Sequence, residues 1–340
     1  MPSGSRVTLA DVAADAGVSR STASLVLRGG GRLSDATRRK VTTSMERLGY
    51  VYHRGAASLR LQRSEAVGLL VTDITHPFFA EMALGLERAL ERHALVTMVS
   101  NTFDAVARQD RLLTTLLERQ IDGLVLVPAQ GSDAGLLDRL DRLRVPYLLT
   151  TRYLPGEAAP YLGPDDLLGG ELAAGHLIEH GATRMAYLGG PENAVARKDR
   201  VAGFRRRIAQ AGPDVRIVAD LPGATSAEGG RELGRLLLER EEFPDGIICH
   251  SDTIAFGLYR VLRDLAPGRL AEVRVIGFDD LAVADFWEPP LTSVSVHPQH
   301  LGELAAETLH NAMAVGERPT GEVKVRPELV VRRSCGCGSL

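Results

Sequence analysis

From Ala66 onward the sequence alternates short apolar runs with longer amphipathic stretches, and this alternation restricts the possible folds more than any other feature. The runs have the length and composition of buried strands, and the stretches between them have helical spacing. Strands that alternate with helices form parallel sheets through crossover connections. We therefore predict an α/β fold with two lobes, each built on an open parallel sheet. The predicted strands are 66–74, 96–101, 123–128 and 147–151 in one lobe and 185–190, 217–221, 246–251 and 273–280 in the other.

Polar and aromatic residues follow several of these runs, at the edge of the sheet where ligands bind in open α/β folds. They are Asp73, Phe78 and Phe79 after the first run, Arg197 and Arg200 after the fifth, and Asp252 and Asp279 after the seventh and eighth. An aromatic platform, an arginine and carboxylates suit a small polar or polyhydroxylated ligand. We therefore expect a ligand site between the lobes. Three of these residues have an alternative role that does not involve a ligand. Asp252 could cap a helix, Phe79 could belong to the core, and Arg197 could be a surface charge.

The first 63 residues concentrate the positive charge of the chain. They hold eleven arginines and lysines against four acids, a formal charge of +7, whereas the whole chain carries −3. The rest of the chain therefore carries −10. A basic head on an acidic body favours a polyanion as the partner of the head, although a solvated basic surface would have the same charge.

The head also has the pattern of three short helices. Thr8 with Asp11 fits a capping box, Gly17 permits a tight turn, and Ser19 is suited to cap the second helix. Two helices joined by such a turn and followed by a third indicate a helix-turn-helix unit. A purely structural three-helix bundle is the alternative.

The second of these helices would enter the major groove of DNA by its N-terminus. We then expect Arg20 and Ser21 to face base edges, and the hydroxyls of Thr22 and Ser24 to lie near phosphates. This explains why polar residues occupy one side of a helix whose other positions are small or apolar.

The pattern T-x-x-D-V-A-x-x-A-G-V-S-x-x-T-x-S from Thr8 to Ser24 resembles the lactose/galactose repressor (LacI/GalR) family. The resemblance implies that Arg20, Ser21 and the residue at position 25 read bases. That residue is usually arginine in the family and is Leu25 here, which can contact a thymine methyl but cannot hydrogen-bond a base. The DNA contacts expected in the head are Thr8, Ser19, Arg20, Ser21, Thr22, Ser24, Leu25 and Arg28.

Residues 51–64 join the head (1–50) to the body (65–340). In the family this segment folds into a hinge helix on DNA, and a pair of leucines from two subunits enters the minor groove. Ala56 and Leu59 match the family's A-x-x-L. Apolar side chains that wedge between base steps bend DNA in this way. A plain flexible linker is the alternative.

The resemblance continues through the body, in the segments D-x-x-x-P-F-F, R-V-A-G-F, S-D-x-x-A-x-G and G-F-D-D. It implies an effector site containing Phe78, Phe79, Arg200 and Asp279. Thr151, before Arg152, and Ser251 replace an acid and an asparagine of the family. The expected effector site therefore comprises Asp73, Phe78, Phe79, Thr151, Arg200, Ser251, Asp252 and Asp279. The resemblance places one lobe at about 65–161 and 291–320, and the other at about 162–290 and 321–334.

Two further motifs concern metals. The segment H-L-I-E-H, from His176 to His180, matches the H-x-x-E-H of some zinc proteases, but it is also an ordinary helix end in the family. Cys335 and Cys337 offer two soft ligands near the end of the sequence. We expect no catalytic site, no metal and no cofactor.

These observations predict a cytoplasmic, homodimeric transcription regulator of the repressor type, which binds a palindromic double-stranded DNA operator. A sugar or a similar small polar effector in the interlobe cleft would control it. No apolar signal core and no membrane span are evident in the sequence. A sugar-binding module without a role on DNA is the alternative.

Overall fold

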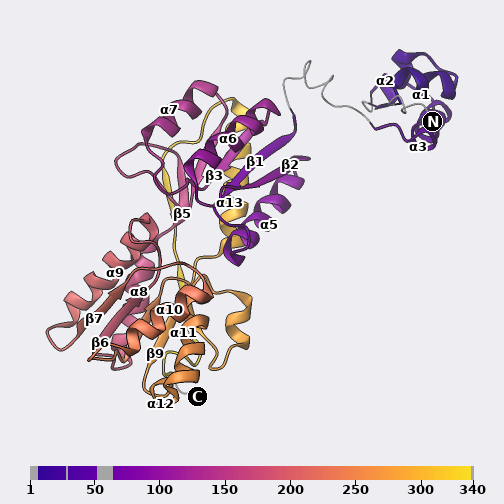
Figure 1. Ribbon diagram of the computed structural model, residues 1–340. Coiled ribbons are helices and arrows are strands. Elements are labelled where there is room, and N and C mark those ends of the chain that lie inside the picture. Colours follow the sequence, from indigo (N-terminus) through magenta and orange to yellow (C-terminus); the bar gives the residue numbers. More distant parts are fainter. Residues whose placement is uncertain (1–6, 28–29, 52–63, 338–340) are drawn as a thin grey trace. The chain divides into compact units, whose positions relative to one another are not determined.

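The computed structural model describes residues 7–27, 30–51 and 64–337, and the chain divides into two compact units, Met1–Ser64 and Glu65–Leu340 (Figure 1). The second unit starts where the body is predicted to start. Arg28, Ala56 and Leu59 lie outside the described residues, so their contacts with DNA stay predictions.

The first unit contains three helices, α1 (Leu9–Ala16), α2 (Arg20–Leu27) and α3 (Asp35–Leu48). Thr8 and Asp11 form the predicted capping box at the start of α1, and Gly17 ends this helix in a left-handed conformation with a φ of 66°. Val12, Ala13, Ala23 and Val41 form a small core between the helices. This is the predicted helix-turn-helix arrangement.

Lobe 1 of the second unit is built on a six-stranded sheet in the order β11-β5-β4-β3-β1-β2, with every pairing parallel. Its strands are β1 (Ala66–Val71), β2 (Val96–Asn101), β3 (Gly123–Leu126), β4 (Tyr147–Thr150), β5 (Tyr161–Pro164) and β11 (Glu322–Val325). Its helices are α5 (Pro77–Glu91), α6 (Val106–Glu118), α7 (Ala134–Leu143) and α13 (Pro298–Val315). One face of the sheet packs on α5 and α13, and the other packs on α6 and α7.

Lobe 2 has a six-stranded sheet in the order β12-β10-β9-β8-β6-β7, which is parallel except for the β10–β12 pair. Its strands are β6 (Arg184–Leu188), β7 (Arg216–Leu221), β8 (Gly246–Cys249), β9 (Arg274–Phe278), β10 (Thr292–Ser295) and β12 (Glu328–Val330). Its helices are α8 (Asp166–Glu179), α9 (Val195–Ala211), α10 (Ala227–Leu238), α11 (Asp252–Leu265), α12 (Pro267–Leu270) and the 3-10 helix η1 (Ala282–Phe286). One face packs on α8 and α9, and the other on α10 and α11. Among the described helices, none is both long enough and apolar enough to span a membrane.

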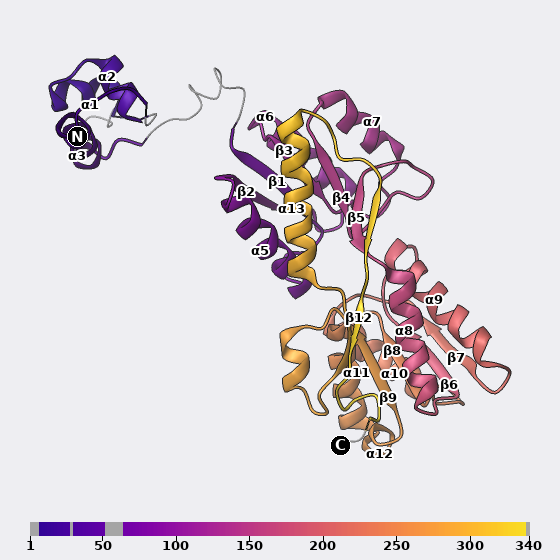
Figure 2. The same cartoon turned by 180° about the vertical axis from the view of Figure 1, so that it is seen from behind.

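The chain passes between the lobes three times (Figure 2). Each passage comes a few residues later than the boundaries near 161, 290 and 320 that the sequence suggested. Strand pairing explains the difference, because β5 and β11 complete the sheet of lobe 1 and β10 pairs with β9 in lobe 2. Lobe 1 thus comprises 65–164 and 298–325, and lobe 2 comprises 166–295 and 328–337.

Candidate functional site

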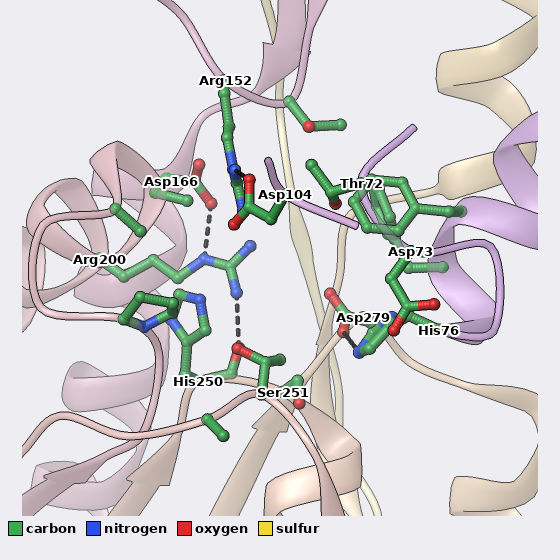
Figure 3. A pocket seen from close by; sticks show the side chains of 18 of the residues that line it. Thr72, Asp73, His76, Asp104, Arg152, Asp166, Arg200, His250, Ser251 and Asp279 are labelled. Atoms are coloured by element: carbon green, nitrogen blue, oxygen red, sulfur yellow. Dashed lines mark hydrogen bonds and ion pairs between the residues drawn. The ribbon is translucent and has the colours of Figure 1, made fainter. Parts of the chain in front are cut away.

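A cavity of about 440 Å³ lies between the two lobes (Figure 3). Its walls come from the segments that follow β1, β2 and β4 in lobe 1 and β6, β7, β8 and β9 in lobe 2. These are the carboxyl ends of parallel strands, where open α/β sheets bind ligands. The volume is within the range of small-molecule sites. The predicted interlobe cleft is therefore present.

Arg200 is buried in the wall that lobe 2 contributes. Its Nε donates to Asp166 Oδ1 at 2.6 Å, its Nη1 donates to the His250 carbonyl at 2.6 Å, and its guanidinium lies 4.1 Å from the centre of the Phe278 ring. Gly170 permits the close approach of α8 and α9 that positions Arg200. A Cβ at this position would lie 2.1 Å from the Arg200 carbonyl oxygen and would push the two helices apart. Figure 3 shows the guanidinium directed toward the interior of the cavity.

The two members of this ion pair respond differently to burial. Burial raises the pKa of Asp166 to about 6, although the neighbouring Arg200 charge opposes this shift. Burial lowers the pKa of Arg200, but the charges of Asp166, Tyr187 and Asp279 and the hydrogen bond to Asp166 together raise it above its usual value. The arginine therefore supplies a fixed positive charge and N–H donors to a ligand that carries oxygen acceptors.

Asp279 and His76 face each other from opposite lobes. The His76 Nε2 lies 3.9 Å from Asp279 Oδ2, and both residues line the cavity. Burial raises the pKa of Asp279, while the charges of His76 and Arg200 lower it. Both ring nitrogens of His76 are buried without a hydrogen-bond partner. Because such an unpaired buried group is costly, a ligand that hydrogen-bonds His76 would remove that penalty.

Arg152 and Asp104 form a second ion pair in the cavity wall, in lobe 1. The two guanidinium Nη atoms reach the two carboxylate oxygens at 2.6 and 3.2 Å, which is a forked contact. Thr151, a predicted site residue, lies beside this pair with a φ of 57°. Asp104 and His76 were not predicted as site residues, although both follow predicted strands. Asp166, whose partner lies 34 residues away along the chain, was not predicted either.

Seven of the eight residues expected to contact the effector line the cavity: Asp73, Phe78, Phe79, Thr151, Arg200, Ser251 and Asp279. Phe78 and Phe79 meet edge to face, with ring centres 5.2 Å apart, and Phe78 is buried. The Asp73 carboxylate accepts hydrogen bonds from the Thr75 backbone and hydroxyl at 3.0 and 2.7 Å, which shapes the loop before α5.

Asp252 is the exception among the expected effector contacts. It is fully buried, and its two carboxylate oxygens accept from Ser293 Oγ at 2.6 Å and the Leu281 backbone at 2.7 Å. It therefore joins α11 to neighbouring segments instead of lining the cavity. Arg197, for which a surface charge was the alternative, is buried instead, pairs with Asp220 and donates to the Gly189 carbonyl at 3.0 Å.

In the first unit, α2 presents the predicted polar face. Arg20 and Ser21 are exposed and Leu25 is 37% exposed, whereas Ala23 on the other side of the helix is buried. The Ser19 Oγ accepts from the Thr22 backbone at 3.1 Å, so it caps α2. The Thr8 hydroxyl donates to the Asp11 carboxylate at 2.7 Å. The side chains expected to meet bases thus lie on an accessible face of the helix.

A basic helix-turn-helix head joined to a two-lobed unit with an interlobe cavity defines a DNA-binding transcription regulator that responds to a small molecule. Residues 8–52 match the profile of bacterial regulatory proteins of the lacI family, and residues 174–335 match that of the periplasmic binding protein-like domain. The ribose operon repressor of Escherichia coli (strain K12) is 31% identical to this chain over 333 residues, which cover 96% of this chain and 99% of the repressor. The chain belongs to the lacI family.

Solved structures agree with this assignment. A complex of the transcriptional regulator CelR with cellobiose matches with a TM-score of 0.72 at 31% identity, covering 97% of this chain and 100% of that one. The lac repressor dimer bound to operator and the anti-inducer ONPF matches with a TM-score of 0.86 at 23% identity, covering 97% and 99% of the two chains. The second match concerns the fold alone, and it confirms the predicted fold class.

Proposed function

We propose that a small polyhydroxylated molecule, of the sugar class, binds in the interlobe cavity and thereby changes the affinity of the head for its operator. The observation that carries this proposal is the mixed character of the cavity wall. It combines the aromatic side chains Phe78 and Phe79 with the buried Arg200 and Asp279, and it contains the unpaired ring nitrogens of His76. Sugars present apolar C–H faces and hydroxyls that both donate and accept, so both kinds of surface have a partner on such a ligand.

The relatives support the same ligand class. One of them is named as a repressor of a ribose operon, and another was solved with cellobiose. The cavity of this chain has two residues, Thr151 and Ser251, in place of an acid and an asparagine expected from the family pattern. We therefore propose that the ligand lies against Asp73, Phe79, Arg200 and Asp279, with Thr151 and Ser251 deciding which sugar fits.

On the DNA side, we propose that Arg20 recognises a guanine, because it is the one exposed arginine at the start of α2 and can donate two hydrogen bonds to one base edge. Ser21 and Leu25 would add shorter-range contacts. Ser19, Thr22 and Ser24 would lie near phosphates, and Leu59 would enter the minor groove.

We further propose that the protein acts as a cytoplasmic homodimer on a palindromic operator and that it catalyses no reaction. A two-fold operator and a pair of inserted leucines both require two subunits. The relatives reported above are named as regulators, and one was solved as a dimer on operator DNA.

Gel-shift titration of the full chain against genomic fragments, repeated with a panel of pentoses, hexoses and disaccharides that includes ribose and cellobiose, tests the proposal. We expect one sugar to change operator affinity and to raise the melting temperature of the protein. Arg200→Lys should lose this response, whereas Arg206→Lys should keep it, because Arg206 lies on the same helix as Arg200, is 62% exposed and does not line the cavity. A sugar that acts equally on both variants, or operator binding that no member of the panel alters, would contradict the proposal.

A further inference from the structure

Two histidines and two cysteines meet in lobe 2, at the end of α8 opposite Asp166. The Cys337 Sγ lies 3.3 Å from His176 Nε2 and 3.1 Å from His180 Nε2, and 3.0 Å from Cys335 Sγ. The ligand atoms of His176, His180 and Cys337 all lie within 4.8 Å of one another. None of these four residues lines the interlobe cavity. This cluster combines the two metal-related motifs of the sequence, which are more than 150 residues apart.

We propose that His176, His180, Cys335 and Cys337 bind one divalent transition-metal ion of the zinc class in a tetrahedral site with two nitrogen and two sulfur ligands. Two imidazoles and two thiolates form a donor set typical of structural zinc sites. With four protein ligands, no coordination position stays open for a substrate, so the site is structural and not catalytic. It uses both histidines of the segment H-x-x-E-H, but it lacks the open coordination position that a zinc protease needs.

The histidines are already oriented for this role. His176 and His180 are four residues apart and project from the same side of α8, with ring centres 4.2 Å apart. The His180 Nδ1 donates to the His176 carbonyl at 2.8 Å. This bond places the proton on Nδ1 and leaves the lone pair of Nε2 directed at Cys337. A hydrogen bond from the second ring nitrogen is the usual way in which proteins orient a metal-binding histidine.

The cysteines are held by the sheet and do not belong to a loose tail. The Ser334 Oγ donates to the Val275 carbonyl at 2.7 Å and accepts from the Thr292 backbone at 2.7 Å. Cys335 is fully buried. Gly336, with a φ of 81°, makes the turn that brings Cys337 back toward Cys335. The sequence indicates only that these thiols are two soft ligands near its end, whereas the fold places α8 beside β12 and so brings the histidines to them (Figure 2).

The distances from Cys337 Sγ to its three neighbours are close to those of a tetrahedral ion. With Zn–N near 2.0 Å and Zn–S near 2.3 Å, a regular tetrahedron requires about 3.6 Å between nitrogen and sulfur and about 3.8 Å between the sulfurs. The observed nitrogen–sulfur distances are 3.3 and 3.1 Å and the sulfur–sulfur distance is 3.0 Å. These three separations must each open by less than about 1 Å. Cys335 Sγ lies outside the group of ligand atoms that are all within 4.8 Å of one another and 3.4 Å from the Arg332 carbonyl, so its side chain must rotate toward the histidines to complete the tetrahedron. A bond between the two cysteines would instead bring their sulfurs to about 2.05 Å.

The consequence of such a site is a link between the last turn of α8 and the segment that follows β12. A single ion would join these two parts of lobe 2. An ion that binds the folded protein and not the unfolded chain stabilises the folded protein. The first residue of α8, Asp166, holds Arg200 in the cavity wall. The metal would therefore fix the helix that carries one wall of the cavity, without contacting the ligand.

Cobalt titration of the full chain, purified without a histidine tag, tests this inference. The protein is first reduced and stripped of metal with a chelator. We expect one equivalent of Co²⁺ to give the thiolate charge-transfer band and the strong visible bands of tetrahedral coordination, and an equivalent of Zn²⁺ to remove them. Bound Zn²⁺ should raise the melting temperature by roughly 10 °C.

Variants separate this site from other metal-binding groups. Cys337→Ser and His180→Gln each remove a metal ligand. They should weaken cobalt binding by more than the ~10–100-fold that follows when a ligand loses its hydrogen-bond partner. Cys249→Ser removes a buried thiol elsewhere in lobe 2, and His93→Gln removes a ring from the separate cluster of His93, Glu307 and His310. Both controls should keep the cobalt spectrum. Cys337 is partly exposed, so its variant should fold even where a change of the buried Cys335 does not.

Three results would overturn the proposal. Wild-type protein that gives no thiolate band with excess Co²⁺ has no such site. A band that survives in Cys337→Ser arises from other ligands. A Cys335–Cys337 disulfide that persists in the reduced protein, seen by mass spectrometry, would show that these thiols pair with each other and not with a metal.

Discussion

Replacement of Arg200 by methionine should destabilise the second unit strongly, because it leaves the Asp166 carboxylate buried without its partner. Both side chains of the pair are buried, and the contact is short, at 2.6 Å. Removal of one partner of a buried ion pair costs about 3–5 kcal/mol of unfolding free energy. For a domain of this size, 1 kcal/mol corresponds to roughly 2–4 °C, so the melting temperature should fall by about 6–20 °C. Methionine retains apolar contact with Phe278, so little is lost there.

The double variant Asp166→Asn, Arg200→Met separates the structural role of Arg200 from its role in ligand binding. With both charges removed, no uncompensated buried charge is left, and we expect the double variant to regain most of the stability that Arg200→Met loses. It should still fail to bind the sugar that the wild-type protein binds, since the N–H donors are absent. Arg206→Met, which removes a guanidinium that is 62% exposed, should cost less than about 1 kcal/mol.

Urea unfolding of the full chain gives the free energies, and calorimetric titration with the identified sugar gives the affinities. A single variant as stable as the wild-type protein would show that the pair does not stabilise the fold. A double variant that binds the sugar with wild-type affinity would refute the assignment of Arg200 as a ligand contact.

Three further predictions concern Arg20, Leu59 and the Asp166 carboxyl group. Arg20→Ala should cost roughly 1–3 kcal/mol on the specific operator and much less on random DNA in filter-binding titrations, and equal losses on both would show that Arg20 reads no base. Leu59→Ala should reduce the bend angle measured by circular-permutation gel mobility and leave sugar binding intact, whereas an unchanged angle would make residues 51–64 a simple linker. Because burial raises the pKa of Asp166 to about 6 in the folded protein, its stabilising contribution is complete below about pH 4 and is lost as the pH rises through 6. The stability advantage of wild type over Asp166→Asn in urea unfolding should thus shrink as the pH rises from 4 to 7, and an advantage that grows with pH would show that the Arg200 charge outweighs burial.

The main strands of both lobes could be predicted from the sequence, because each is an apolar run between helical segments. The strands β5, β10, β11 and β12 could not, because polar residues or a proline interrupt their apolar pattern and because their pairing depends on the chain passing between the lobes. The predicted lobe boundaries were displaced for this reason. Local signals in the head were stronger, since the Thr8 cap and the Gly17 turn are determined by adjacent residues.

Site residues at strand ends could likewise be predicted from the parallel sheet topology. It places Phe79 beyond the carboxyl ends of the strands in lobe 1 and Asp279 at those in lobe 2. The ion pairs could not be predicted. Arg152 and Asp104 lie 48 residues apart, and Asp166 lies 34 residues from Arg200. Asp252 also follows a strand, yet its carboxylate is taken up by Ser293 and Leu281, and only their position in space reveals this. Sequence reasoning locates the edge of the sheet, whereas side-chain partners across the fold decide which residues stay available to a ligand.

The contact between His76 and Asp279 indicates how a ligand can act on more than its own cavity. His76 belongs to lobe 1 and Asp279 to lobe 2, so their separation of 3.9 Å depends on how the lobes are arranged. A ligand shifts that arrangement only by the difference in its affinity for the two states, and moving a 1:99 equilibrium to 99:1 requires about 5.5 kcal/mol. Contacts with one lobe alone supply no such difference. A sugar that bonds Arg200 or Asp279 on one side and His76 on the other gains those bonds together in a single arrangement. Lobe 1 begins at Glu65, directly after the segment 51–64 that carries Leu59. The residues that face each other across the cavity are therefore the ones whose replacement should uncouple sugar binding from operator release.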